Sequence, residues 1–195
     1  HLGVDCVSLL PSKVWGDPDK YRNGKLSPRI VKVLKDCHPS FFRFPGGCVV
    51  EGDEIFDNMY KWRNTVGALE ERRQIANTWG YMQSYGVGFY DYFALCEDLK
   101  MTPLPVLHCG LLCQIRVGEQ RGEGYRRIMP GTKEFKHEVI DNVADLLFFA
   151  LGSADSEDAN EAHWAKVRGE MGHPAPLELK HIGIGNQNWA NEYFE

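Results

Sequence analysis

Three short apolar segments alternate with helical patterns along this chain, and each of them ends in glycine or small polar residues. Alternation of strand and helix predicts a parallel α/β sheet, in which functional groups gather at the C-terminal ends of buried strands. We therefore expect strands near residues 41–45, 103–108 and 180–186 that are parallel and adjacent, with helices outside them. A doubly wound sheet and a (β/α)8 barrel both fit this alternation.

Helical segments are predicted from apolar residues at positions i, i+3, i+4 and i+7 and from capping residues. The first begins at Ser27, the expected N-cap, with Pro28 in its first turn, and the second covers residues 88–100. Thr132 caps a third, long helix, and Ser156 caps a fourth. The residues expected to face inward are Ile30, Val33, Leu34 and Cys37 in the first helix, and Val139, Val143, Leu146, Leu147 and Ala150 in the third.

Composition narrows the classes of function. The 195 residues carry a net charge of −5 without an evident basic face, which argues against nucleic acid and anionic membranes as partners. No apolar run approaches the length of a membrane span, and no signal peptide is visible. The chain opens at His1 and stops within residues 191–195, so we expect it to be a fragment of a longer polypeptide.

Glycine and cysteine patterns indicate neither a nucleotide site nor a metal site. Gly86-Val87-Gly88 and Gly183-Ile184-Gly185 lack the third glycine of a dinucleotide fingerprint, and no P-loop lysine motif is present. Cys109 and Cys113, with His108 beside them, lack the second half of a zinc site and lie in an apolar setting, so we expect buried thiols there. No metal and no cofactor are predicted.

Three amides, Asn186, Gln187 and Asn188, follow the third predicted strand and are backed by Trp189. A strand followed by an asparagine-rich turn would explain them without any function. The segment 48–78 is too long and too polar for a simple connector, and long loops in compact domains are usually functional or disordered. Its aromatic residues favour order, and aromatic rings beside polar groups are also a means of holding sugars.

Six motifs then occur in one order along the chain. They are Phe42–Gly52 (FRFPGGCVVEG), Trp62 with Val66-Gly67-x-x-Glu70-x-Arg72, Asn77–Tyr81 (NTWGY), Cys96–Leu99 (CEDL), Trp164–Pro174 (WAKVRGEMGHP) and Ile184–Trp189 (IGNQNW). This order resembles glycoside hydrolase family 51, the α-L-arabinofuranosidases, whose signatures include RFPGG and a strand end with the sequence IGNE. The resemblance covers nearly the whole chain.

The resemblance implies a (β/α)8 barrel, of which residues 1–195 would supply about strands two to four, with residues 1–11 as the exit from a preceding β-domain. A barrel typically needs about 250 residues, so the other strands, the nucleophilic glutamate and an accessory β-domain would lie in the remainder of the polypeptide. The implied activity is that of a retaining exo-glycosidase that releases α-L-arabinofuranosyl residues from polysaccharides or oligosaccharides without a cofactor. We expect a secreted or periplasmic location rather than a cytoplasmic one.

Two positions depart from the family pattern. The family carries a glutamate, the general acid/base, where this chain has Gln187, and the resemblance leads to asparagine where the chain has His108. An amide keeps the shape of the carboxyl group but transfers no proton near neutral pH. Either the glutamine was introduced to trap a bound sugar, which we favour because the other signature positions are intact, or it is natural and leaves a binding protein.

The resemblance assigns roles to the matching positions. Gln187 stands at the acid/base position, and Asn186 should hydrogen-bond the 2-hydroxyl of the sugar. Arg43 should orient carboxylates rather than touch sugar. Gly47 and Cys48 should form the turn against the furanose ring, where glycine lets the backbone come close.

Trp79 is the first candidate for a sugar platform, before Trp62 and Trp189. Together with Cys48 and the two amides at 186 and 187, Trp79 should line one pocket. Glu51 is an alternative carboxylate, although its spacing favours a structural role. Two other classes of function stay open, namely a hydrolase of the same clan acting on xylosides or glucans, and a catalytically inactive carbohydrate-binding protein.

Overall fold

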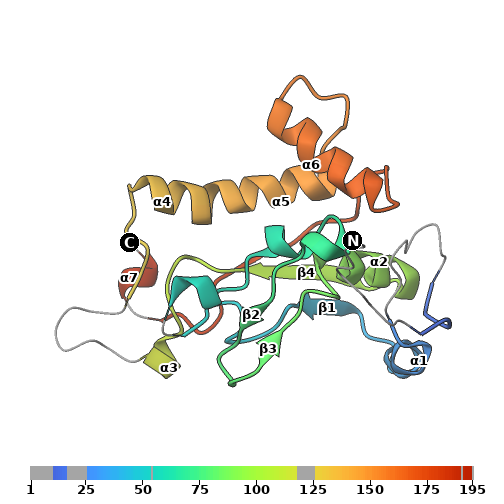
Figure 1. Ribbon diagram of the computed structural model, residues 1–195, viewed down its shortest axis with the longest axis horizontal. Helices are drawn as coiled ribbons and strands as arrows, with labels where there is room; N and C mark the ends of the chain where they lie inside the picture. The colour runs from blue at the N-terminus through green and yellow to red at the C-terminus, as the bar shows by residue number, and fades with distance from the viewer. Residues whose placement is uncertain (1–10, 17–25, 54, 118–125, 190, 195) are drawn as a thin grey trace, which may run out of the picture.

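The computed structural model describes residues 11–16, 26–53, 55–117, 126–189 and 191–194 (Figure 1). The domain boundary expected at residues 1–11 falls almost wholly outside these ranges and stays a prediction. Within the described ranges, no helix is both long enough and apolar enough to cross a membrane.

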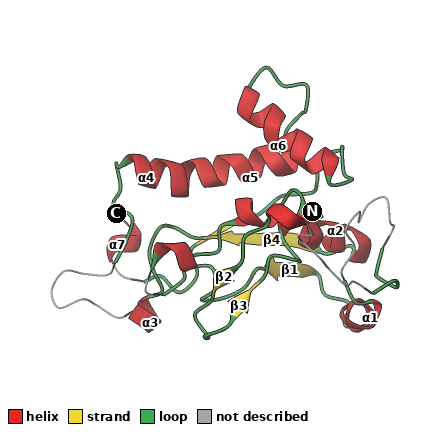
Figure 2. Cartoon of the chain, viewed as in Figure 1, coloured by secondary structure: helices red, strands yellow, loops and turns green. Residues whose placement is uncertain are grey.

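A three-stranded parallel sheet lies at the centre of the fold (Figure 2). Its order is β1 (Phe41–Phe44), β4 (Thr102–Leu107) and β5 (Gly183–Ile184), so the middle strand comes second in the sequence. Both ladders are parallel. The prediction of three parallel and adjacent strands is therefore confirmed, and the chain has a mixed α/β fold.

The third strand is shorter than predicted, since β4 pairs with it only at Val106 and Leu107. The backbone N–H of Thr102 donates toward the β1 side of the sheet. Strand geometry alternates the bonding direction, so the backbone nitrogens of Pro103 and Pro105 face β5. Proline has no N–H to donate. Pairing with β5 therefore begins only after the second proline.

Helices surround the sheet and connect its strands (Figure 2). The α-helices of the described ranges are α1 (Pro28–Asp36), α2 (Phe89–Leu99), α3 (Gln114–Val117), α4 (Lys133–Phe135), α5 (Asp141–Leu151), α6 (Ala159–Glu170) and α7 (Asn191–Phe194). A π-helical turn, η4 (Lys136–Ile140), joins α4 to α5, so that the two form one long rod above the sheet in Figure 1.

The described residues of the long segment between β1 and α2 follow a defined path, as the aromatic residues indicated. Its 3-10 turns are η1 (Phe56–Asn58), η2 (Trp62–Thr65) and η3 (Leu69–Glu71), and they precede an antiparallel hairpin of β2 (Ile75–Ala76) and β3 (Met82–Gln83). A segment of this length keeps a defined path because several of its rings enter the core.

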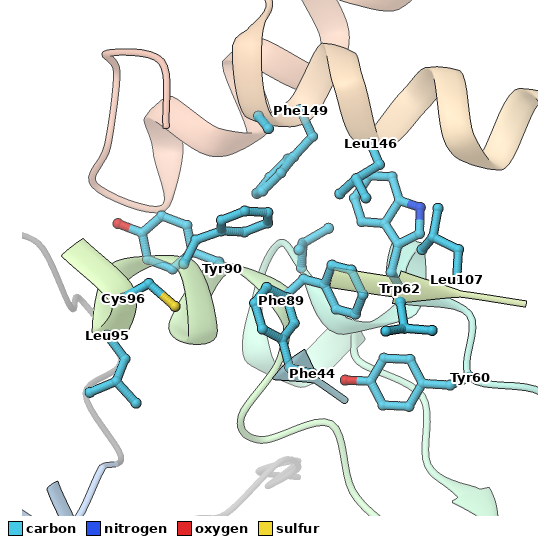
Figure 3. Close-up of a cluster of buried hydrophobic side chains, with 14 of the residues drawn as sticks. Phe44, Tyr60, Trp62, Phe89, Tyr90, Leu95, Cys96, Leu107, Leu146 and Phe149 are labelled. Carbon is cyan, nitrogen blue, oxygen red and sulfur yellow. The ribbon is translucent and has the colours of Figure 1, made fainter. Parts of the chain in front are cut away.

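Aromatic rings from four elements form the core between the sheet and the helices (Figure 3). Phe44 of β1 packs edge-on against Phe89 and Phe93 of α2, with ring centroids 5.1 and 5.3 Å apart. Trp62 of η2 is fully buried, and its ring centroid lies 5.5 Å from that of Phe149 on α5. Trp62 is therefore a core residue, and the expectation that it serves as a sugar platform is wrong.

Helix α1 begins at Pro28 as predicted, but it presents a different face to the core. Ile30 and Val33 are 64% and 63% exposed and Cys37 is also exposed, whereas Val31 is buried. Successive residues of a helix are separated by about 100°, so the buried face is turned by about one position from the predicted one. The apolar pattern predicts which side of the helix is apolar, but it does not predict which part of that side a neighbouring element will cover.

The inward face predicted for the third helix is largely confirmed. Val139, Leu146 and Ala150 are buried and Val143 packs against the core, whereas Leu147 is 39% exposed. The polar residues Asn142 and Asp145 of α5 are buried as well. The backbone carbonyl of Asn142 accepts the indole N–H of Trp62 at 3.0 Å. Apolar periodicity did not mark Asn142 and Asp145 because both are polar; the Asp145 carboxylate pairs with Arg63 at 2.6 Å and accepts from Asn160 Nδ2 at 2.6 Å.

Helix α6 is capped by Asp158 rather than by Ser156. The Asp158 carboxylate accepts the backbone N–H groups of Asn160 and Glu161 at 2.8 and 3.1 Å. Ser156 Oγ instead donates to the Glu161 carboxylate at 2.8 Å. A carboxylate at this end of a helix also meets the positive end of the helix dipole, which favours aspartate over serine as the cap.

Candidate active site

Soon after β1 the chain makes a single helical turn. This turn presents Cys48 and Glu51 on the same side. Val50 N donates to Gly47 O at 3.0 Å, and Glu51 N donates to Cys48 O at 3.1 Å. Residues three apart on such a turn are neighbours. Glu51 is fully buried and Cys48 is half-buried, so the turn directs a carboxylate and a thiol into the molecule.

The chain leaves β5 through Gly185, whose backbone is left-handed with a φ of +73°. Its N–H still donates to Leu107 O at 2.7 Å, which extends the bonding to β4. A Cβ at this position would lie 2.4 Å from Asn188 Oδ1, so only glycine fits here. This bend brings the next two residues, Asn186 and Gln187, to the turn that follows β1.

Four hydrogen bonds join Asn186 and Gln187 to the β1 side of the sheet. Arg43 Nη2 donates to Asn186 Oδ1 at 2.6 Å, and Asn186 Nδ2 donates to Glu51 Oε2 at 3.1 Å. Gln187 N donates to Glu51 Oε1 at 2.9 Å, and Cys48 Sγ donates to Gln187 Oε1 at 3.1 Å. Both ends of the Asn186 amide are thus oriented, and one Nδ2 hydrogen is left for a ligand.

Glu51 holds the two residues at the strand end in place, because each of its oxygens accepts one of their N–H groups. This role agrees with the structural function that its spacing favoured. Arg43 bonds an amide, whereas a carboxylate partner was expected. A Cβ on Gly47 would lie at an ordinary contact distance of 4.0 Å from Asn186 Nδ2, so the described residues leave room for a Cβ there.

Two half-exposed indoles flank α3. Trp79, on the turn between β2 and β3, is 50% exposed, and Trp189 is 52% exposed. The Arg116 guanidinium lies 5.1 Å from the Trp79 ring centroid, and Gln114 Oε1 accepts the backbone N–H of Trp189 at 2.8 Å. In Figure 1, α3 and α7 lie at the same end of the molecule. The predicted role of both indoles as sugar platforms stays a prediction.

The structure brings three of the four expected pocket residues together, because Cys48 and Gln187 are bonded and Asn186 precedes Gln187. Trp79 contacts Arg116 of α3, and its place in the same pocket stays a prediction. Sequence reasoning missed Gln114, since a buried glutamine within an apparently polar loop carries no pattern that distinguishes it from its exposed neighbours.

Three cysteines lie near these strand ends, and all of them are free thiols. Cys113 is fully buried, and burial raises the pKa of its thiol to about 12. The ligand atoms of Cys48, Glu51 and Cys113 all lie within 4.8 Å of one another. The structure therefore gathers a different group from His108, Cys109 and Cys113, the set weighed on the sequence alone.

His108 follows β4 and is not a member of this cluster. It is buried, and among the described residues neither ring nitrogen has a hydrogen-bond partner. Burial lowers the pKa of His108 to about 4, against a smaller opposing effect of Glu138, and the cations Lys61 and Arg63 lower it further. The imidazole is therefore neutral in the folded protein at neutral pH.

We expect His108 to make the protein less stable in mild acid. Below the usual pKa of 6.5 the unfolded chain binds a proton at this residue, whereas the folded chain does so only near pH 4. Stability is therefore lost as the pH falls through this window, by about 2 kcal/mol between pH 7 and pH 5. Chemical denaturation at both values should show this extra loss in the unchanged protein and not in His108→Asn. The exposed His163→Asn is the control, and an equal loss in all three proteins would contradict the assignment.

In α/β enzymes, the active site forms at the edge of the sheet where the parallel strands have their C-terminal ends. Amides, a buried carboxylate and exposed indoles are typical of such sites. Such a set of donors, acceptors and ring faces suits a ligand rich in hydroxyl groups. The fold therefore places the chain in the class of α/β domains with a parallel sheet and outer helices.

Comparison with known proteins identifies the family. Residues 33–195 match the model of the α-L-arabinofuranosidase 1 domain. An extracellular exo-α-L-arabinofuranosidase from Streptomyces chartreusis is 37% identical over 98% of this chain and 22% of its own length. α-L-Arabinofuranosidase 2 from Arabidopsis thaliana is 34% identical over 99% of this chain and 25% of its own length. The chain belongs to the α-L-arabinofuranosidase 1 domain family, and it spans about a quarter of the length of these relatives.

Solved structures agree. An arabinose-bound α-L-arabinofuranosidase of glycoside hydrolase family 51 matches with a TM-score of 0.68 and 28% identity, over 84% of this chain and 23% of that chain. The arabinose complex of the Thermotoga maritima α-L-arabinofuranosidase shares the fold, with a TM-score of 0.58 and 20% identity over 89% of this chain and 28% of that chain. The resemblance to glycoside hydrolase family 51 is thereby confirmed.

Proposed function

We propose that the protein containing this chain is built as a retaining exo-glycosidase for α-L-arabinofuranosyl residues of polysaccharides or oligosaccharides. The observation that carries this proposal is the network in which Arg43 and Glu51 orient Asn186 directly before position 187. In the family motif that position is the general acid/base. An extracellular location, which the name of the Streptomyces relative states for that protein, belongs to the same proposal.

The proposal includes an architecture. Strands β1, β4 and β5 would be about the second, third and fourth strands of a (β/α)8 barrel, and residues 1–195 would be a fragment of that catalytic domain. Retention requires two carboxyl groups about 5–5.5 Å apart. Glu51 suits neither role, because both of its oxygens already hold Asn186 and Gln187. The nucleophile would therefore come from the remainder of the polypeptide.

Each residue of the network then has a task toward the sugar. The free Nδ2 hydrogen of Asn186 would donate to the 2-hydroxyl, a contact that strengthens in the transition state. Cys48 and Gly47 would lie against the furanose ring. Trp79 and Trp189 would offer ring faces to the part of the substrate that departs, because aromatic faces pack well on the C–H surface of a sugar.

Gln187 favours a second function, which is sugar binding without hydrolysis. Its amide can hold the glycosidic oxygen by a hydrogen bond but cannot transfer a proton to it. A glutamine introduced to trap a sugar and a natural glutamine in a binding protein lead to the same chemistry at this position. The two differ in what glutamate at position 187 would restore.

Replacing Asn186 with alanine should weaken the binding of an arabino-oligosaccharide roughly 10-fold, because one hydrogen bond to the sugar is lost, at about 1.4 kcal/mol. Isothermal titration calorimetry on the full-length protein measures this without hydrolysis of the ligand, since Gln187 is kept. Gln74→Ala, which removes an exposed amide outside the network, is the matched control and should bind as the unchanged protein does.

Crystals of the full-length protein soaked with arabinose give a direct position for the sugar. We expect density within hydrogen-bond distance of Asn186 and Gln187. Sugar density that is consistently distant from Gln187, or an Asn186→Ala variant that binds as tightly as the control, would refute this site.

A further inference from the structure

Two thiols and a carboxylate lie together beside the proposed sugar site, and the thiol of Cys113 has no part in hydrolysis. The ligand atoms of Cys48, Glu51 and Cys113 are all within 4.8 Å of one another. Two atoms bound to one tetrahedral zinc ion through bonds of about 2.0–2.3 Å lie roughly 3.3–3.8 Å apart. Side-chain rotations that draw the three groups together by about 1 Å would close them around one ion.

The charge of Glu51 also indicates a cation. A buried carboxylate is costly unless it is paired with an opposite charge or fully hydrogen-bonded. Across the described part of the chain, no lysine, arginine or histidine forms an ion pair with Glu51. The groups that Glu51 accepts from are amide N–H groups of Asn186 and Gln187, and Arg43 is bonded to Asn186.

We propose that Cys48, Glu51 and Cys113 form a binding site for Zn²⁺. Two sulfur donors with one carboxylate oxygen suit zinc, whereas Ca²⁺ and Mg²⁺ take shells of oxygen. Binding releases the two thiol protons to solvent, forms two Zn–S bonds and one Zn–O bond, and changes no oxidation state. Gln187 Oε1, which lies 3.1 Å from Cys48 Sγ, is an oxygen within reach of the fourth position.

Zinc at this site would exclude the sugar, because Cys48 and Gln187 also belong to the proposed sugar site. The ion would therefore act as an inhibitor of sugar binding rather than as a cofactor. The zinc site itself does not rest on the glycosidase proposal, since none of its contacts involves a sugar. Zinc binding without sugar binding would support the zinc site and contradict the proposed function. Sugar binding without zinc binding would support the proposed function and contradict the zinc site.

The test uses the full-length protein, reduced and freed of metal with a chelator. Titration with ZnCl₂ followed by calorimetry should show one tight equivalent. Replacing Cys48 or Cys113 with serine should weaken it by at least about 100-fold, since removal of a ligand costs at least as much as removal of an outer-shell partner. The controls are Cys37→Ser, at the exposed end of α1, and Cys109→Ser, a neighbouring thiol outside the set; both should bind zinc as the unchanged protein does.

X-ray absorption at the zinc edge gives a reading that needs no variant, which matters because serine at the buried position 113 carries a risk of misfolding. The unchanged protein with one equivalent of zinc should show two sulfur neighbours at about 2.3 Å together with oxygen neighbours. A shell of nitrogen and oxygen alone, no tight equivalent in the titration, or full zinc affinity in a folded Cys48→Ser variant would each overturn the proposal.

Discussion

Replacing Gln187 with glutamate in the full-length protein is expected to raise the turnover of α-L-arabinofuranosides by about 10²–10⁴-fold, the usual contribution of general acid/base catalysis. The network around Asn186 already holds position 187 at the strand end, so a proton-transfer group is what this segment lacks. A carboxyl group there protonates the leaving oxygen and then activates water. The gain should be largest for an arabino-oligosaccharide, whose poor leaving group needs protonation.

An activated aryl arabinoside separates the two proton transfers. Its leaving group departs without protonation, so the Gln187 protein should still form the covalent intermediate and then stall, because no base activates water. Azide needs no general base, and its addition should relieve the stall and yield a glycosyl azide. The Gln187→Glu protein should show neither the stall nor the effect of azide.

The measurement is the turnover of both proteins on an aryl arabinoside and on an arabino-oligosaccharide, with and without azide. Equal rates for the two proteins on the oligosaccharide would rule out an acid/base role for position 187. No activity in either protein, combined with intact sugar binding, would favour the carbohydrate-binding function.

Replacing Trp62 with alanine is expected to cost about 3–5 kcal/mol of stability, the range for removing a large aromatic side chain from a core. The ring is fully buried against Phe89, Phe149 and Trp164, and its N–H is bonded to Asn142 O. Chemical denaturation followed by circular dichroism measures the loss. Trp189→Ala is the matched control, and because Trp189 is half-exposed its change should stay within about 0.5 kcal/mol.

A milder variant separates a core role from a sugar platform. Trp62→Phe keeps most of the ring contacts but leaves the Asn142 carbonyl without its indole partner, which should cost about 1–3 kcal/mol. Sugar affinity of the folded variant should be unchanged, because the indole is shielded from solvent. A Trp62→Phe protein with full stability and weakened sugar binding would restore the platform role and contradict the burial seen here.

The strands and most helices were predictable because their signals are local. Proline and glycine end the segments, and a period of 3.6 marks a helix whatever packs against it. The IGNQ and RFPGG motifs pointed to Gln187 and Cys48 as neighbours, and the two side chains are in contact. The left-handed turn at Gly185 is local as well, since the clash of a side chain there is with Asn188 three residues away.

The orientation of the elements was not predictable in the same way. Ile30 and Val33 lie on the apolar side of α1, as predicted. The elements that pack against α1, however, cover the part of that side that holds Val31. On α5, the buried positions also include Asn142 and Asp145, and the Asp145 carboxylate finds its partners in Arg63 and Asn160, which are distant in the sequence. Apolar periodicity reports the side chains of one element, whereas burial depends on the shape of the element that packs against it.

The amino-acid sequence by itself determined the parallel α/β order, the family and the position of the glutamine at the strand end. Each of these follows from short motifs, whose residues are neighbours in the sequence. Only the tertiary structure decided that Glu51 holds Asn186 and Gln187 from 135 and 136 positions away. It alone placed Cys113 beside Cys48 and Glu51, and it alone buried Trp62 while leaving Trp79 and Trp189 half-exposed. A tryptophan, a thiol or a carboxylate has the same chemistry wherever it stands in the sequence, and its role depends on which distant groups the packing of the sheet brings to it.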